Sequence, residues 1–128
     1  MATISRNFSS ESTIENGTTL SGTTEEKSSD VDLETNGYVG AHVIVDVTWD
    51  GSGSENLRVN FYGSLDGTNY DDEAFFSQEL AVSAGNTVQY SFIITDVLHF
   101  QVGFEHVASE SNEATITCKY QAWNYTNS

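Results

Sequence analysis

The chain has 128 residues, which fits a single domain because domains commonly contain about 100–200 residues. Hydrophobic residues make up 38% of the sequence, but its apolar runs are far shorter than the roughly 20 residues of a membrane-spanning helix. Four Lys and Arg against 19 Asp and Glu give a net charge of −15. Nucleic-acid binders need clustered basic side chains to neutralise phosphates, so this charge argues against nucleic-acid binding and against contact with anionic membranes.

The first 27 residues differ from the rest of the chain and predict an extended arm. They are rich in Ser and Thr, and their sizeable apolar side chains follow no helical or strand period. Such a segment cannot bury enough apolar surface by itself to offset the entropy lost on ordering. We therefore expect residues 1–27 to extend from a domain at 28–128 and to order on a neighbouring subunit, with removal of the arm leaving the domain folded. The expected anchors are Ile4, Phe8, Ile14 and Leu20.

From Ser28 onward, alternation with period 2 and Gly- or Asp-rich turns predict about seven strands. In the clearest of them, Ala41, Val43, Val45, Val47 and Trp49 share one face. No window shows a helical stripe, so the predicted fold is an all-β antiparallel sandwich, Ig-like or jelly-roll. The expected strands cover residues 28–34, 38–49, 57–65, 73–80, 87–95, 99–108 and 114–124.

Residues suited to catalysis are few. His42, His99 and His106 are the only side chains that normally titrate near neutral pH, and the last two are seven positions apart in one expected strand, so they point to opposite faces. The single cysteine, Cys118, forbids an internal disulfide and a cysteine-based zinc site. We expect neither enzyme activity nor a cofactor.

Acidic residues crowd the turn after residue 65. Oxygen ligands from Asp66, Asp71 and Asp72 are of the type that Ca²⁺ prefers, so a calcium site is one interpretation of this turn. The EF-hand spacing is absent, however, and an acidic loop is expected on so acidic a chain. A solvated turn without metal is the preferred interpretation.

Four aromatic residues fall on outward positions or at the ends of elements. Exposed aromatic rings commonly mark contact surfaces, and sugars stack on them in carbohydrate-binding sandwiches. The alternative is that some of these rings close the ends of the sandwich. The candidates for surface or glycan contact are Tyr62, Tyr70, Trp123 and Tyr125.

The segment Tyr62–Asp71 (YGSLDGTNYD) is the most specific local pattern, with Asp66 and Gly67 in the turn and an aromatic residue three positions later. Together with the closing segment Gln121–Tyr125 (QAWNY), it resembles small virion structural proteins of tailed bacteriophages over residues 36–125. The resemblance implies a non-enzymatic protein made in the host cytoplasm and built into the virion. It carries over no catalytic residues.

These observations favour a capsid decoration or cement subunit that binds neighbouring subunits through its arm and sandwich. Its expected partners are other virion proteins, such as a major capsid protein, and further copies of itself in a homo-oligomer. The alternative is a carbohydrate-binding or host-adhesion module that uses the aromatic residues. A third interpretation is an acidic inhibitor that mimics DNA.

Overall fold

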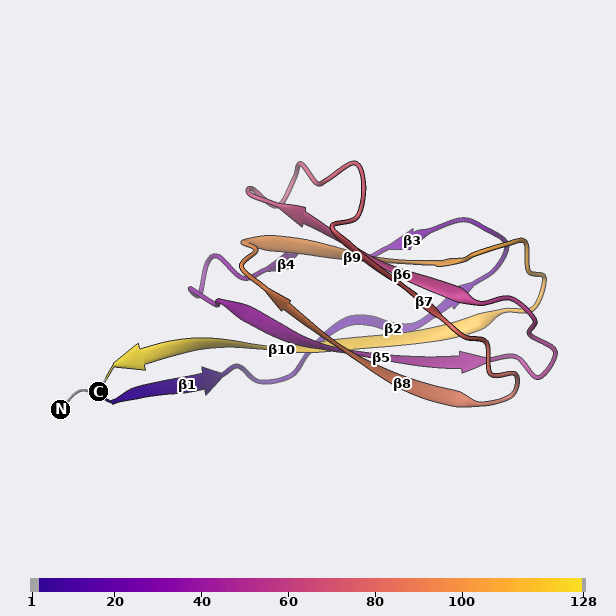
Figure 1. The fold of residues 1–128 in the computed structure, drawn as a ribbon, viewed down its shortest axis with the longest axis horizontal. Helices are drawn as coiled ribbons and strands as arrows, with labels where there is room; N and C mark the ends of the chain where they lie inside the picture. Colours follow the sequence, from indigo (N-terminus) through magenta and orange to yellow (C-terminus); the bar gives the residue numbers. More distant parts are fainter. Residues whose placement is uncertain (1–2, 128) are drawn as a thin grey trace.

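The alternating strands pair into two antiparallel sheets in the computed structural model, which describes residues 3–127 (Figure 1). Residues 1–2 and 128, at the outer ends of the expected arm and domain, lie outside the described residues. One sheet contains β1 (Ile4–Phe8), β2 (Ser12–Leu20), β10 (Ala114–Asn127), β5 (Gly40–Trp49) and β8 (Thr87–Thr95). The other contains β3 (Glu26–Lys27), β4 (Val31–Asp32), β9 (His99–His106), β6 (Leu57–Ser64) and β7 (Phe76–Leu80).

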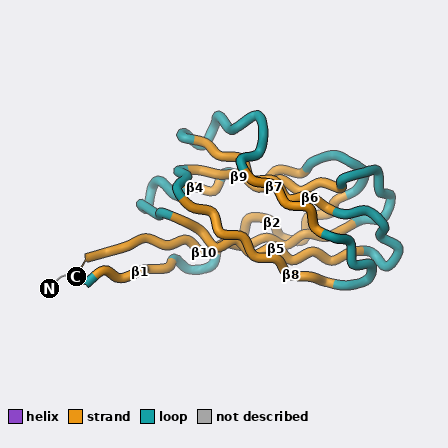
Figure 2. The backbone as a smooth tube through the Cα atoms, in the orientation of Figure 1, coloured by secondary structure: helices purple, strands orange, loops and turns teal. Residues whose placement is uncertain are grey.

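The chain passes repeatedly from one sheet to the other. The order in the first sheet is β1, β10, β5, β8, and β2 pairs with the part of β10 nearer its start. The order in the second sheet is β3, β9, β6, β7, and β4 also pairs with β9. Figure 2 shows the loops gathered largely at the ends of the two layers. This confirms the predicted all-β antiparallel sandwich: from Ser28 onward the described residues form seven strands, β4 to β10, and β1 to β3 come from the segment expected to be an arm.

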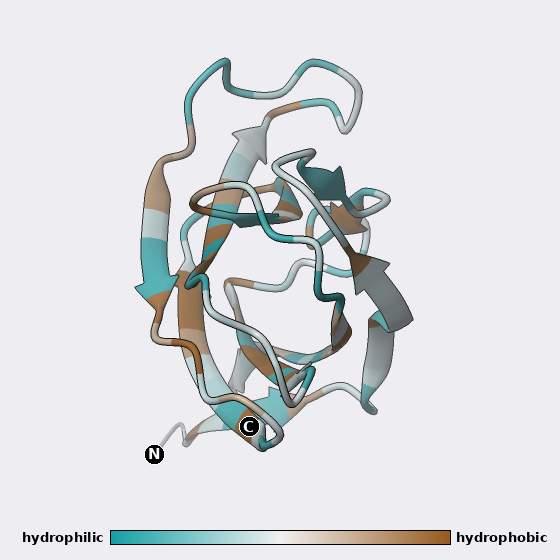
Figure 3. Ribbon diagram, turned by 90° about the vertical axis from the view of Figure 1, so that its right-hand side faces the viewer, coloured by the Kyte–Doolittle hydropathy of each residue, from teal (hydrophilic) through white to brown (hydrophobic). Residues whose placement is uncertain are grey.

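The core lies between the sheets and follows the predicted alternation. Ala41, Val43, Val45 and Val47 of β5 are fully buried, and so are the inward residues of β6 and β9. Figure 3 shows the hydrophobic segments mainly on strands, with hydrophilic colour over most of the loops. Within residues 3–127, no helix has the length and apolar character that crossing a membrane requires.

The structure differs from the expected arm. Strands β1 and β2 run along one edge of β10, where Phe8 pairs with Trp123 and Leu20 with Ala114, and β3 pairs with β9. An open strand edge offers backbone donors and acceptors to any extended segment, whatever the polarity of its side chains. The predicted boundary between residues 27 and 28 is therefore wrong, because residues 4–27 supply strands to both sheets.

The four expected anchors are divided between the core and the surface. Leu20 is buried in the core of its own chain, and Ile14 packs against that core from a partly buried position. Neither side chain is available to anchor a neighbour. Ile4 and Phe8 are 71% and 54% exposed, so these two keep the surface that an anchor needs.

Candidate functional site

Strand β1 and the end of β10 form a two-stranded ribbon that extends beyond the other strands (Figures 1 and 2). We call residues 4–8 and 123–127 the ribbon. All five residues of β1 are exposed. Residues directly opposite one another in an antiparallel pair share a face, and here Arg6 lies opposite Tyr125. One face therefore carries the large side chains, and we call it the ribbon face: Ile4, Arg6, Phe8, Trp123 and Tyr125.

Arg6 occupies the middle of the ribbon face among three aromatic rings. Its guanidinium carbon is 5.6 Å from the ring centroids of Trp123 and Tyr125 and 6.0 Å from that of Phe8. A guanidinium nitrogen also donates to the Tyr125 hydroxyl at 3.3 Å. Cations at such distances are attracted by the ring faces, and arginine keeps its charge throughout the accessible pH range. The ribbon face thus presents one fixed positive charge within an aromatic surface.

Trp123 is the buried residue of the ribbon face and packs against the sheet. By alternation it points to the outer side of its sheet, yet it is buried, because its indole lies directly over Gly40 of the neighbouring strand. A β-carbon at that position would overlap the indole ring, so only glycine leaves the necessary space. The Phe8 ring covers the indole from the other strand, with 6.3 Å between centroids. Tyr125 stays half exposed.

A second surface feature lies between the β6–β7 loop (residues 65–75) and the β8–β9 turn (residues 96–98). It is an open pocket of about 560 Å³. Exposed apolar side chains of Leu65, Phe75 and Leu98 line it, and the carboxylates of Asp71 and Asp96 lie among them. We call this feature the loop pocket. Its combination of apolar walls and carboxylates is the reverse of the ribbon face, which is apolar and positively charged.

The loop beside the pocket is held by its own carboxylates. Asp66 accepts hydrogen bonds from the backbone N–H groups of Thr68 and Asn69, and these bonds hold the pKa of its carboxyl below the usual range. Asp71 accepts from the backbone N–H of Gly63 at 2.8 Å. Both carboxylates thereby fix the loop.

These hydrogen bonds also affect the hypothesis that Asp66, Asp71 and Asp72 bind calcium. No group of three or more potential metal-ligating side chains is present among residues 3–127. The carboxylate of Asp66 is directed at donors of its own turn instead of a shared centre. The carboxylates of Asp66 and Asp71 are thus committed to hydrogen bonds from their own loop and from the Gly63 backbone.

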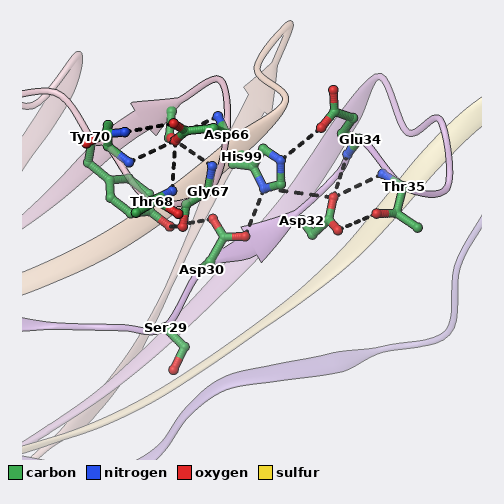
Figure 4. Close-up of polar contacts among 12 residues, drawn as sticks. Ser29, Asp30, Asp32, Glu34, Thr35, Asp66, Gly67, Thr68, Tyr70 and His99 are labelled. Atoms are coloured by element: carbon green, nitrogen blue, oxygen red, sulfur yellow. Dashed lines mark hydrogen bonds and ion pairs between the residues drawn. The ribbon is translucent and has the colours of Figure 1, made fainter.

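His99 lies at the centre of a polar cluster that links this loop to β4 (Figure 4). Its Nδ1 is 2.8 Å from an Asp30 oxygen, and its Nε2 is 3.2 Å from a Glu34 oxygen. The hydrogen bond with Asp30 is the main cause that raises the pKa of His99. Tyr70 donates to the other oxygen of Asp30. Asp30 therefore ties the loop to β9 through two partners.

This cluster does not have the arrangement of a nucleophilic active site. A histidine that activates a hydroxyl needs one ring nitrogen directed at that hydroxyl, whereas both nitrogens of His99 face carboxylates. His106 is buried on the opposite face, as alternation predicts, with its Nδ1 on the carbonyl oxygen of Gly22. His42 lies half buried on the outer side of β5. The three histidines do not converge.

The four predicted glycan-contact residues do not form one platform. Tyr62 is buried and donates its hydroxyl to Glu25, whose carboxylate lies across Gly103. Burial, followed by this hydrogen bond, raises the pKa of Tyr62. Tyr70 lines the loop pocket and is engaged with Asp30. Only the remaining pair, Trp123 and Tyr125, lies together, on the ribbon face.

The sequence analysis identified Trp123 and Tyr125 as candidate contact residues, but it did not predict that β1 pairs with them to form the ribbon face. The alternation of Ile4, Arg6 and Phe8 is the signal that was available, since three residues at spacing two mark one side of a short strand. The pairing with residues 123–127 is a contact across most of the chain, and no local pattern specifies it.

No family model and no curated protein matches this chain. Among solved structures it is similar to a chain of the T13 IBDV viral particle, with a TM-score of 0.57 and 10% identity over 91% of this chain and 31% of that one. It is similar to tripeptidyl peptidase 2, with a TM-score of 0.54 and 11% identity over 84% of this chain and 9% of that one. It is also similar to a family 16 carbohydrate-binding module, with a TM-score of 0.48 and 10% identity over 88% and 75% of the two chains. At such identities the likeness establishes the β-sandwich fold alone, a fold that serves structural and binding modules alike.

Proposed function

We propose that this chain is a non-enzymatic structural subunit of a virus particle, a decoration or cement protein that binds neighbouring subunits. The observation that carries the proposal is the ribbon, which extends from the sandwich and exposes Ile4, Phe8 and Tyr125. A folded chain rarely leaves large apolar side chains together on a projecting element unless a partner covers them. The fold shared with a chain of the T13 IBDV viral particle supports the same assignment.

The mode of binding differs from a flexible arm. The segment that contacts neighbours is ordered on its own β10 before binding, so that little backbone entropy is lost at the moment of contact. Repetition of such contacts over a symmetric shell raises the overall affinity through avidity, even where each contact is weak. The geometry of the three histidines supports a role without catalysis.

The carbohydrate-binding alternative has less support, because only Trp123 and Tyr125 of its four aromatic candidates lie together and Trp123 is buried. Binding of the purified chain to a glycan array, lost on Tyr125→Ala, would favour this alternative over the structural role.

The test of the proposal uses virus particles purified on a density gradient from the culture that produces the chain. We expect peptide mass spectrometry to find the chain in these particles at a copy number comparable to that of the shell proteins. The double variant Ile4→Ser, Phe8→Ser should be depleted from particles, whereas Ile93→Ser should be retained, because Ile93 is equally apolar and 61% exposed but lies on β8. Absence of the chain from purified particles would overturn the proposal.

A further inference from the structure

Two exposed surface features of this chain, the ribbon face and the loop pocket, match each other in character. The ribbon face is aromatic and bears the positive charge of Arg6. The loop pocket is apolar and bears the negative charges of Asp71 and Asp96. We infer that the ribbon of one copy docks into the loop pocket of a second copy of this chain. The inference names the partner for the surface on which the proposed function rests.

The distribution of charge supports a second copy as the occupant. The chain carries a net charge of −15, so two copies repel each other over most of their surfaces. Arg6 is the only charged residue in segments 1–10 and 120–128 of the sequence, which contain the whole ribbon. The ribbon therefore meets the acidic surface of another copy without like-charge repulsion, and Arg6 adds an attraction.

The shape of the ribbon supports the same occupant. It extends beyond the remaining strands, so it reaches a neighbour while the two acidic bodies stay apart (Figure 1). The ring of Phe8 and the side chain of Ile4 have the apolar character of the pocket walls formed by Leu65 and Leu98.

Within the pocket, Asp96 is the free counter-charge for Arg6. The carboxylates of Asp66 and Asp71 accept hydrogen bonds from their own loop. No group within residues 3–127 donates to the Asp96 carboxylate, which is exposed at the pocket. Asp96 has a φ of 60°, a conformation that Asp and Asn adopt more readily than most residues, so the turn holds its side chain at this place. An arginine from another copy would form a charge-assisted hydrogen bond with this carboxylate.

Because the contact joins two different surfaces, each surface can be altered in a separate variant. Arg6→Glu alters the ribbon and leaves the pocket intact. Leu65→Arg places a positive charge at the pocket, where Leu65 is 80% exposed, and leaves the ribbon intact. Each variant alone should lose self-association by at least about tenfold, as expected for loss of a central contact. In an equimolar mixture, the ribbon of the Leu65→Arg chain meets the pocket of the Arg6→Glu chain, so 1:1 pairs should form.

Sedimentation velocity measures these species, with the full chain at concentrations up to about 1 mM, the weak end of specific association. The wild-type chain should associate in a concentration-dependent manner, and Arg6→Lys should retain most of this association. Ala84→Arg is the matched control for added charge, because it lies in the exposed turn between β7 and β8, at the other end of the sandwich from the ribbon, and should associate as the wild type does.

A monomeric wild-type chain, a mixture that stays monomeric, or variants that still associate alone would each overturn the inference. Pairing in the mixture also demonstrates that both variants are folded. The outcome is separable from that of the proposed function, because a monomeric chain that is nevertheless present in purified particles refutes only the self-docking.

Discussion

Truncation of Leu20 tests whether the N-terminal segment belongs to the body of the protein. The side chain is 1% exposed and lies in the core cluster, with Ala114 of β10 as its paired residue. Leu20→Ala removes about three carbons at about 0.8 kcal/mol each and leaves a cavity that relaxes only in part. We expect a loss of about 2–5 kcal/mol in the free energy of unfolding. Ile4→Ala, on the exposed part of the same segment, should change it by less than about 0.5 kcal/mol.

Urea unfolding followed by tryptophan fluorescence measures both values, since Trp49 is buried in the core. Leu20→Met, which conserves volume, is the control and should cost less than about 1.5 kcal/mol. An effect of Leu20→Ala below about 0.5 kcal/mol would refute the reasoning, because that is the behaviour of a residue on an unattached arm. For the same reason, removal of residues 1–27 should unfold the sandwich, contrary to the expectation drawn from composition.

Three further predictions concern single contacts. Gly40→Ala should displace the Trp123 indole, shift tryptophan emission to longer wavelength and cost about 1–3 kcal/mol through overpacking; an unchanged spectrum would contradict this packing. Four hydrogen bonds to its carboxylate, led by the Ser54 backbone N–H, lower the pKa of Glu110 to about 2. Its contribution to the stability of the fold is therefore present above pH about 4.5 and is lost as pH falls toward 2. Thermal melts of Glu110→Gln should therefore lie well below the wild type at pH 6 and converge with it near pH 2. Because the pKa of His99 is raised, its ion pairs stabilise the fold below pH about 6.5, and this stabilisation is lost as pH rises through the raised value. His99→Gln should therefore lower the melting temperature more at pH 5.5 than at pH 9. An equal effect at both pH values would contradict the ion pairs.

Alternation in the sequence was sufficient to predict the strands that form the core. The range 87–95 agrees with β8, and the inward residues of β5 and β9 are those that the period of two selects. In these strands one face is buried, so whether a side chain is apolar or polar indicates whether it faces the core or the solvent. Some ends of the expected strands differ. Leu65 follows the last residue of β6 and lies in the exposed loop, and residues 73–75 of the expected strand 73–80 precede β7.

The remaining features depend on contacts between distant residues. The Ser- and Thr-rich β2 is held mainly by backbone pairing with β10, which leaves no apolar period in the sequence. Trp123 and Tyr62 were correctly assigned to outward faces, yet both are buried, one by Phe8 over Gly40 and the other by Glu25. Covers of this kind come from residues far away in the chain, so side-chain parity cannot reveal them.

The edge of the ribbon also bears on how copies of this chain meet. Strand addition at an open edge is the simplest route to association for a sandwich, and it is also the route to uncontrolled aggregation. Within the described residues, β1 pairs on one side only, but it is five residues long and includes the charged Arg6, features that limit further pairing. Association through the ribbon face avoids this hazard, because side chains with one charge and a defined shape select their partner, whereas backbone groups accept any extended segment. The specificity of the contact should therefore depend on Arg6 and the aromatic rings around it, which is why the charge change at Arg6 is a sharper test than removal of the strand.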